Sequence, residues 1–286
     1  MTAAGLELNV THGAVSRQVA LLEDWLGVAV FQRTHSGLLL TDHGRIFFGE
    51  VSAALDRLAL AAMQISHTAN VSQLIVSAPP TFTLRWLIPR LAAYQRRHHG
   101  INVCLTTSLE PVNFSREIYH IAIRGSREPL EGVVSRPFMT EKIVPVCSPA
   151  LRDKQPLTGI HDLARHTLIA YSTEPYSWRD WFDTQGTREV KPAGTLDFEQ
   201  MFFALQAAQE GLGIALIPYF LVADDIAAGH LCAPLGGVGG LQRRYWLNLS
   251  PHLKVSDAQE GFCRWIEQEG AKTMALCDQL MGLDAG

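Results

Sequence analysis

The chain has 286 residues, of which 47% are hydrophobic and 18% charged, with a formal net charge of −4. This length is enough for two domains of ordinary size, and the composition is that of a folded globular protein. The negative net charge gives no overall attraction to nucleic acid or to anionic membranes. No apolar run reaches the ~20 residues of a membrane span, and the N-terminus lacks the pattern of a secretory signal. We therefore expect a cytoplasmic protein with no membrane partner.

The cysteines are scattered through the chain without a Cys-x-x-Cys pair. Their odd number argues against a disulfide framework. We therefore expect buried free thiols at Cys104, Cys147, Cys232, Cys263 and Cys277.

The first 66 residues are expected to form two helices, a short hairpin and a long third helix. The first helix extends to about Leu8, and Thr11 is placed to cap the second. Apolar residues of the second helix recur at helical spacing, at Val15, Val19, Leu22 and Leu26. Gly27 ends this helix, and two strands follow at Val28–Phe31 and Leu38–Leu40.

The face of the second helix opposite its apolar stripe is small and polar at its N-terminal end. Such a helix can enter the major groove of DNA, where its backbone comes close and its side chains reach bases and phosphates. The predicted DNA-contacting residues, one of them on the hairpin, are Thr11, His12, Gly13, Ser16, Arg17 and Arg33. Residues 1–66 hold six acidic and four basic side chains, so the prediction depends on where the arginines lie. An ordinary surface role for these residues stays open.

Thr41 is expected to cap a third helix that continues to about Ser66. Its apolar residues alternate in steps of three and four, as in a coiled-coil seam, at Phe48, Val51, Leu55, Leu58, Ala62 and Ile65. At ~1.5 Å per residue such a helix is too long to pack wholly against its small domain. It is predicted to pair with a copy of itself, and the alternative of a core helix stays open.

Beyond a polar link at Thr68–Ser72, strand-like and helical runs alternate. The expected strands are Leu74–Ser77, Val103–Thr107, His120–Ile123, Ile143–Val146, Leu168–Tyr171 and Ile214–Ile217. The expected helices are Leu84–His98, Trp178–Gln185, Phe198–Glu210 and Pro218–Ala228. This alternation predicts an α/β fold with parallel strands and crossover helices, in one sheet or two.

The stretch LNVTHGAVSRQVALLEDWLGVAVFQRTHSGLLLTDHG resembles the winged helix-turn-helix of LysR-type transcriptional regulators. The matching positions are Leu8, Val10, Thr11, Ala14, Val15, Ser16, Leu22, Glu23, Leu26, Gly27, Phe31, Arg33, Gly37, Leu40, Thr41 and Gly44. The chain departs from the family pattern at Ser36, where arginine is usual, and at His12-Gly13, where Gln-Pro is usual. These departures affect the contacts of the hairpin and the choice of operator.

The resemblance continues through SAPPTFTLRWLIPRLAAYQRRHHGINVCL and LQAAQEGLGIALIPYFLVADDIAAGHL, which are similar to the branch of the family with the glycine-cleavage activator and the β-lactamase regulators. It implies a two-lobed effector domain like a periplasmic binding protein. The implied boundaries are 1–44 for the DNA-binding domain, 45–70 for the linker and dimerisation helix, and 71–286 for the effector domain. One lobe contains about 71–140 and 242–286, and the other 141–241.

Ligands of α/β proteins often bind at the carboxyl ends of strands and at helix N-termini. Thr81 follows one predicted strand, Thr106 and Thr107 end the next, and Leu196–Met201 opens a predicted helix. The resemblance places the effector at this cleft, and the predicted contacts are Thr81, Phe82, Thr106, Thr107, Asn113, Phe198, Glu199 and Met201. Met201 stands where a short hydroxyl is usual and makes the pocket less polar. Helix capping by Thr81 and simple solvation of Thr106 and Thr107 remain alternatives.

No pattern of catalytic or cofactor-binding residues is present. The chain lacks a P-loop and a nucleophile elbow, and its LGGVGG stretch is not followed by a helix that could receive a phosphate. Histidines such as His35 and His43 lack partners at metal-ligand spacing. We expect no enzymatic activity, no cofactor and no metal site.

The leading hypothesis is a LysR-type regulator that binds double-stranded DNA as a homodimer or homotetramer and responds to a small-molecule effector. The second is a small-molecule-binding protein with a defective DNA-binding part, and the third is an enzyme on the same fold. Family members have about twenty further residues before this point, which form a first helix. Met1 is therefore expected to be an internal methionine, and apolar residues of the remaining helices are expected to be uncovered.

Overall fold

The computed structural model describes residues 2–34, 37–66, 72–114, 117, 119–173, 175–187, 190–236, 243–253 and 255–283. The chain divides into two compact units, one built mainly from Met1–Thr68 and the other from Ala69–Phe114 and Tyr119–Gly286. Each unit is described by itself. Within the described ranges, no helix combines the length and the apolar character needed to cross a membrane.

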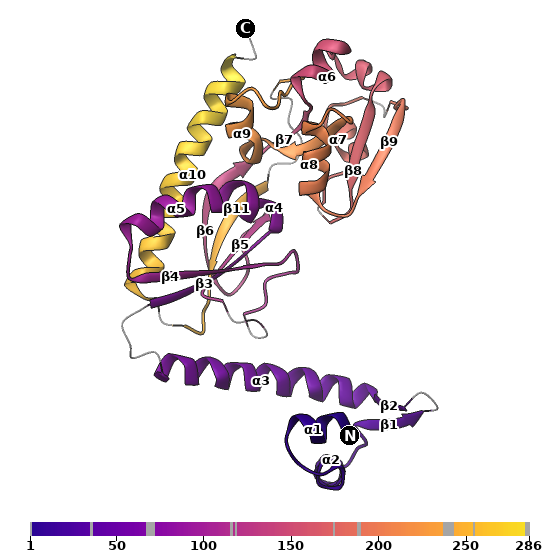
Figure 1. The fold of residues 1–286 in the computed structure, drawn as a ribbon, viewed down its shortest axis with the longest axis vertical. Helices are drawn as coiled ribbons and strands as arrows, with labels where there is room; N and C mark the ends of the chain where they lie inside the picture. The colour runs from indigo at the N-terminus through magenta and orange to yellow at the C-terminus, as the bar shows by residue number, and fades with distance from the viewer. Residues whose placement is uncertain are drawn as a thin grey trace. The chain divides into compact units, whose positions relative to one another are not determined.

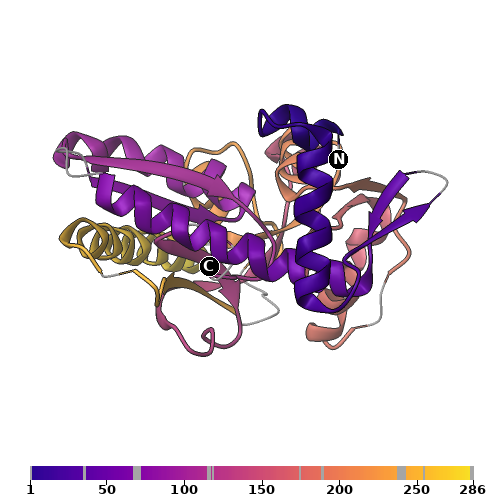
Figure 2. The same ribbon diagram turned by 90° about the horizontal axis from the view of Figure 1, so that it is seen from below.

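The first unit contains three helices and a hairpin. Its elements are α1 (Thr2–Glu7), α2 (His12–Leu26), β1 (Phe31–Thr34), β2 (Gly37–Leu40) and α3 (Asp42–Ser66). Figure 2 shows α2 and the hairpin at one end of α3. The prediction of three helices and a hairpin is confirmed, but the first strand begins at Phe31 and not at Val28. Thr11 caps α2 by accepting a hydrogen bond from the Ala14 amide, and Gly27 ends it in the left-handed conformation.

The hairpin is fixed to the helices by a few polar contacts. The Glu23 carboxylate on α2 accepts hydrogen bonds from the amides of Val30 (2.8 Å) and Phe31 (3.0 Å). The Thr41 hydroxyl donates to the Ala29 carbonyl (2.8 Å) and accepts from the Gly44 amide (3.0 Å). These contacts set the start of β1 relative to α2 and the start of α3.

The second unit has two sheets, each with its own helices. The first sheet has the order β4-β3-β5-β11-β6. Its strands are β3 (Ser72–Ala78), β4 (Ile101–Thr107), β5 (Ile121–Ser126), β6 (Val134–Glu141) and β11 (Arg243–Leu249). β3, β4 and β5 are parallel, as predicted, whereas β11 runs antiparallel to both of its neighbours.

The helices of the first sheet are α4 (Pro80–Phe82), the π-helical turn η1 (Thr83–Leu87), α5 (Ile88–Arg97) and α10 (Asp257–Leu283). α10 lies against the first sheet and contacts β3 and β6 (Figure 1). α5 and α10 pack together through Tyr94 on one helix and Phe262 and Trp265 on the other. β6, β11 and α10 were not predicted from the sequence.

The second sheet has the order β7-β10-β8-β9. Its strands are β7 (Ile143–Val146), β8 (Thr167–Tyr171), β9 (Gly194–Phe198) and β10 (Ile214–Pro218). Its helical segments are α6 (Pro149–Lys154), η2 (Ile160–Arg165), α7 (Trp178–Thr184), α8 (Met201–Gln209) and α9 (Tyr219–Ala227). The expectation of purely parallel strands is wrong for β7, which pairs antiparallel with β10. The helix predicted at Phe198–Glu210 begins three residues later, because Gly194–Phe198 pairs with β8 as a strand.

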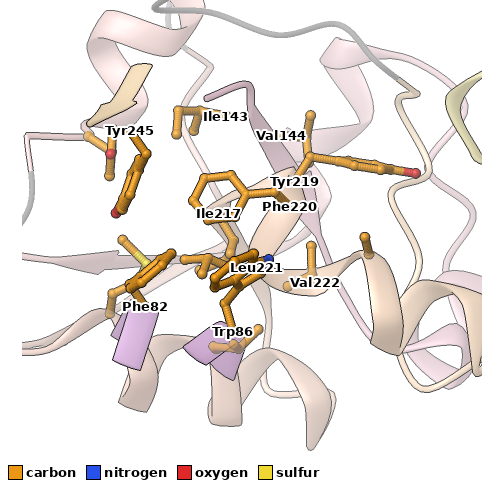
Figure 3. Packing of buried hydrophobic residues seen from close by; sticks show 14 of the residues in the cluster. Phe82, Trp86, Ile143, Val144, Ile217, Tyr219, Phe220, Leu221, Val222 and Tyr245 are labelled. Atoms are coloured by element: carbon orange, nitrogen blue, oxygen red, sulfur yellow. The ribbon is translucent and has the colours of Figure 1, made fainter. Parts of the chain in front are cut away.

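An aromatic cluster joins the two sheets of the second unit (Figure 3). Phe82 stacks on Trp86 and on Tyr245 with ring centroids 5.0 and 5.2 Å apart, respectively. Phe220, from α9 of the other lobe, packs edge-on against Tyr245 at 4.9 Å. Because these four rings are almost fully buried, they hold the lobes together through apolar contact.

We predict that Gly44→Ala destabilises the first unit by about 1–3 kcal/mol, the usual cost of overpacking. A Cβ atom at Gly44 would lie 2.0 Å from the Val30 carbonyl oxygen, so the hairpin and α3 must move apart. Hydrogen exchange of peptides from residues 2–34 should become faster. Gly13→Ala is the matched control, because a Cβ there meets no atom within 4 Å and exchange should be unchanged or slower. Equal exchange in both variants contradicts this account of Gly44.

A second prediction concerns acid stability. The Nδ1 atom of His120 accepts a hydrogen bond from the Ile75 amide (3.0 Å), and burial lowers the pKa of His120 below its ordinary value of 6.5. The unfolded chain therefore binds the proton more readily, and the stability due to neutral His120 is lost as the pH falls from about 6.5 through the folded-state pKa.

The His120→Gln variant keeps an acceptor but does not titrate. We expect the melting temperature of the natural protein to fall more than that of the variant between pH 7 and pH 5. Parallel pH profiles of the two proteins contradict the assignment to His120.

Candidate functional site

The N-terminal end of α2 presents the residues predicted to contact DNA. Thr11, His12, Gly13 and Arg17 are exposed and Ser16 is half-buried. Thr11 is occupied as the helix cap, so its hydroxyl is already bonded to the Ala14 amide (3.2 Å). Arg17 is exposed on the same face of α2 as Gly13 and Ser16. Arg33 lies on β1 opposite Leu38, and its side chain is outside the described part of the structure.

The residues of the predicted dimerisation seam lie on α3. Phe48, Leu55 and Leu58 are 61%, 60% and 66% exposed, and Val51 is half-buried. The side chains of Ala62 and Ile65 are outside the described part. Three of the predicted seam residues are therefore exposed apolar side chains, and the pairing of α3 with a second copy stays a prediction.

Further apolar side chains of the first unit are exposed away from this seam. Leu6 on α1 and Trp25 on α2 are 78% and 79% exposed. The expectation that apolar residues of the short helices lie uncovered therefore holds for these two. Water-exposed surface of this kind is a candidate contact area for another protein segment.

The predicted effector residues of the first sheet lie at its carboxyl edge. Thr106 and Thr107, both exposed, pair in register with Ser77 and Ala78 at the end of β3. Thr81 follows in α4 and is only 3% exposed. The alternative that Thr81 caps a helix is wrong, because α4 begins at Pro80 after Pro79 and has no side-chain cap.

The predicted residues of the second lobe lie around the start of α8. Met201 is the first residue of α8 and is buried, Phe198 ends β9 and is half-buried, and Glu199 is exposed. α8 contacts α4, so the elements that carry Met201 and Thr81 meet between the lobes. Phe82 belongs to the aromatic cluster, fully buried. Asn113 is exposed, and its backbone N–H donates a hydrogen bond to the Tyr119 hydroxyl (3.0 Å).

A polar network, which the sequence analysis missed, also joins the lobes. The carboxylate of Glu141, fully buried at the end of β6, accepts a hydrogen bond from the Tyr176 hydroxyl and lies 3.4 Å from Nε of Arg243. Arg243 also donates to the Tyr176 hydroxyl (3.0 Å) and to the Gly125 carbonyl. Burial raises the pKa of Glu141, whereas Arg243 and Tyr176 act in the opposite direction.

Beside this network lies a cavity of about 480 Å³ between the lobes. Arg127 and Arg243 line it from the first lobe, and Asp180, Asp183 and Thr184 line it from α7. A neighbouring cavity of about 580 Å³ shares both arginines and adds Arg244 and Trp246. Both volumes are in the range of small-molecule sites. Arg127 directly follows β5. The rule that ligands often bind at the carboxyl ends of strands could therefore have identified Arg127 as a candidate site residue from the sequence.

Two family models together match most of the chain. Residues 1–45 match the model described as "Bacterial regulatory helix-turn-helix protein, lysR family", and residues 67–271 match "LysR substrate binding domain". The chain is 32% identical over 271 residues to the HTH-type transcriptional activator AmpR of Rhodobacter capsulatus, which covers 95% of this chain and 92% of the relative. It is 31% identical to the glycine cleavage system transcriptional activator of Escherichia coli K12, over 94% of this chain and 88% of the relative.

Solved structures show the same fold. The effector domain of AmpR from Pseudomonas aeruginosa superimposes on 70% of this chain and 96% of its own length with a TM-score of 0.59 and 27% identity. CrgA, a LysR-type transcriptional regulator from Neisseria meningitidis, covers 98% of this chain and 93% of its own length with a TM-score of 0.54 and 24% identity.

Proposed function

Because the chain belongs to the LysR family of bacterial transcriptional regulators, we propose that it binds promoter or operator DNA as a homodimer or homotetramer in the cytoplasm. LysR-type regulators join a DNA-binding domain to an effector-binding domain and are not enzymes, and we propose no catalytic role for this chain. Residues 1–44 bind DNA, 45–70 dimerise and 71–286 bind the effector. The observation that carries this proposal is the exposed polar N-terminus of α2 beside a hairpin.

DNA recognition is assigned to Thr11, His12, Gly13, Ser16, Arg17 and Arg33. Gly13 has open space around it, so the helix backbone can approach base edges closely. Arg17 and Ser16 follow one turn later and supply donors for bases or phosphates.

The effector is assigned to the region between the lobes. Thr81 and Met201 lie on elements that meet there, and the charged cavity with Arg127 and Asp180 adds further polar groups. A small polar molecule that binds to groups of both lobes favours one arrangement of the two lobes over others. In this way an effector can shift the regulator from one conformation to another.

The second candidate function is a small-molecule-binding protein whose DNA-binding part does not work. The exposed Leu6 and Trp25 favour this candidate, because a DNA-binding unit with uncovered apolar helices is less stable. A gel-shift assay with DNA upstream of the neighbouring divergent gene separates the two candidates. Salt-sensitive binding supports the regulator, and absence of binding at every protein concentration supports the alternative.

We predict that Arg17→Ala lowers DNA affinity by roughly 5- to 160-fold, since a lost base contact costs about 1–3 kcal/mol. If Arg17 contacts phosphate, the salt dependence of binding should also become less steep by roughly one ion per site. Arg179→Ala removes the same charge from the effector unit and should leave affinity unchanged. Equal affinities of the two variants refute the assignment of Arg17.

We predict that Leu55→Asp dissociates the α3-mediated dimer, because a carboxylate would replace an exposed apolar side chain in the middle of the seam. Light scattering after size-exclusion chromatography should show a lower mass at the same concentration. Ile46→Asp is the matched control, because Ile46 is 69% exposed on the same helix but lies outside the seam. An unchanged mass for Leu55→Asp excludes this seam as the dimer contact.

We predict that Thr81→Val weakens the response to effector and leaves DNA binding intact, because valine keeps the shape of threonine but removes its hydroxyl. The response is measured as the change in gel shift on addition of the low-molecular-weight fraction of a cell extract. Thr195→Val, at an exposed position of β9, is the control. A normal response of Thr81→Val removes Thr81 from the effector site.

A further inference from the structure

Two cysteines of the second lobe lie side by side although they are far apart in the sequence. Cys147 follows β7 and Cys232 follows α9, and the two residues form an isolated antiparallel bridge. The Cys147 amide donates to the Cys232 carbonyl (3.1 Å), and the Cys232 amide donates to the Cys147 carbonyl (2.9 Å). Their Sγ atoms are 3.7 Å apart.

This backbone arrangement suits a disulfide. Residues that exchange both hydrogen bonds across an antiparallel pair have Cα atoms about 5.5 Å apart, which is within the range of disulfide-bonded cysteines. The sulfur atoms must approach from 3.7 Å to the S–S bond length of about 2.05 Å. Rotation about the Cα–Cβ bonds can supply this movement, because no change of backbone pairing is needed.

The surroundings of the two thiols differ. Cys147 is 1% exposed, whereas Cys232 is half-buried. The contact with Cys232, together with burial, raises the pKa of the Cys147 thiol, so Cys147 remains protonated in the reduced protein. The guanidinium of Arg152, which also pairs with Asp153 (2.8 Å), interacts electrostatically with both sulfur atoms. The Cys232 thiol donates to the Cys147 carbonyl (3.4 Å). A cavity of about 530 Å³ is lined in part by Arg152 and by Ala233 and Pro234, the two residues that follow Cys232.

We propose that Cys147 and Cys232 are a peroxide-sensitive thiol pair that forms a reversible disulfide. The Cys232 thiolate attacks one oxygen of the peroxide, the O–O bond breaks, and Cys232 becomes a sulfenic acid as hydroxide leaves and is protonated to water. The Cys147 thiol then attacks the Cys232 sulfur, an S–S bond forms as the S–O bond breaks, and the Cys147 proton passes to the leaving hydroxyl, which departs as a second water. Two thiols are oxidised and one hydrogen peroxide is reduced to two waters.

The disulfide would close most of the second lobe into one loop. The two cysteines are 85 residues apart, and β8, β9 and β10 lie between them. Cys232 also stands where the chain leaves the second lobe towards β11, so the bond would fix this exit to the end of β7. Oxidation is therefore expected to raise the melting temperature of the effector unit by several degrees.

The other cysteines serve as internal controls. Cys263 and Cys277 are buried in α10, and burial raises the pKa of each thiol to about 12. Cys104 is half-buried on β4 in the first sheet. The sequence expectation of buried free thiols is thus confirmed for three of the five cysteines, and Cys104 and Cys232 are half-buried.

The test treats the full chain with hydrogen peroxide, then unfolds it, alkylates free thiols and measures the intact mass. We expect the number of alkylated cysteines to fall from five to three, with a Cys147–Cys232 cross-linked peptide, and to return to five after dithiothreitol. A cross-link between other cysteines, or five free thiols at a peroxide concentration that oxidises exposed methionines, overturns the proposal.

The order of the two steps is tested with dimedone, which traps sulfenic acid. In the Cys147→Ser variant dimedone should label Cys232, whereas in Cys232→Ser it should leave Cys147 unlabelled. Labelling of Cys147 alone overturns the assigned order. Circular dichroism is used to check that both serine variants keep the fold. DNA binding is measured on the oxidised and on the reduced protein, so that disulfide formation is tested independently of the proposed regulatory function.

Discussion

The buried carboxylate of Glu141 is the constraint on which the two-lobed unit depends. Glu141 ends β6 in the first sheet, and Ile143 begins β7 in the second, so the carboxylate lies where the chain passes between lobes. An unpaired buried carboxylate would be strongly destabilising. Its partners are Arg243, where the chain returns to the first sheet, and Tyr176 from the second lobe. Loss of either partner would leave a charge or hydroxyl buried at the junction.

The aromatic cluster at the same junction has a complementary role. Stacking of Phe82, Trp86 and Tyr245 is an apolar contact that tolerates small shifts, whereas the bonds of Glu141 require a defined geometry. A molecule bound between Thr81 and the start of α8 would act on the cluster through Phe82, the neighbour of Thr81. The path from a bound molecule to the arrangement of the lobes is therefore short.

The sequence predicted the elements whose signals are local. Thr11 and Gly27 delimit α2, and the helix of the seam begins directly after Thr41. The segment Gly194–Phe198 was misassigned in part because its strand pairing with β8 is a tertiary contact that no local spacing reveals. For the same reason Asp180, which lines a cavity together with residues of the other lobe, was absent from the predicted site. Thr81 and Arg127 each follow a strand, which is a signal that the sequence carries.

The π-helical turn at Thr83–Leu87 has a consequence for comparing related chains. It inserts extra backbone into a helical segment that otherwise runs from Pro80 to Arg97, and both Phe82, just before the turn, and Trp86, within it, are fully buried. Because a π turn holds about one residue more than an α-helical turn, removal of one residue here would restore a regular α-helix and leave the later side chains on the faces they already occupy. Loss of one residue at this turn should therefore disturb the packing of α5 less than loss of one residue within α5, which would rotate the later side chains by about 100°. Helical periodicity counted across the turn is out of phase by one position.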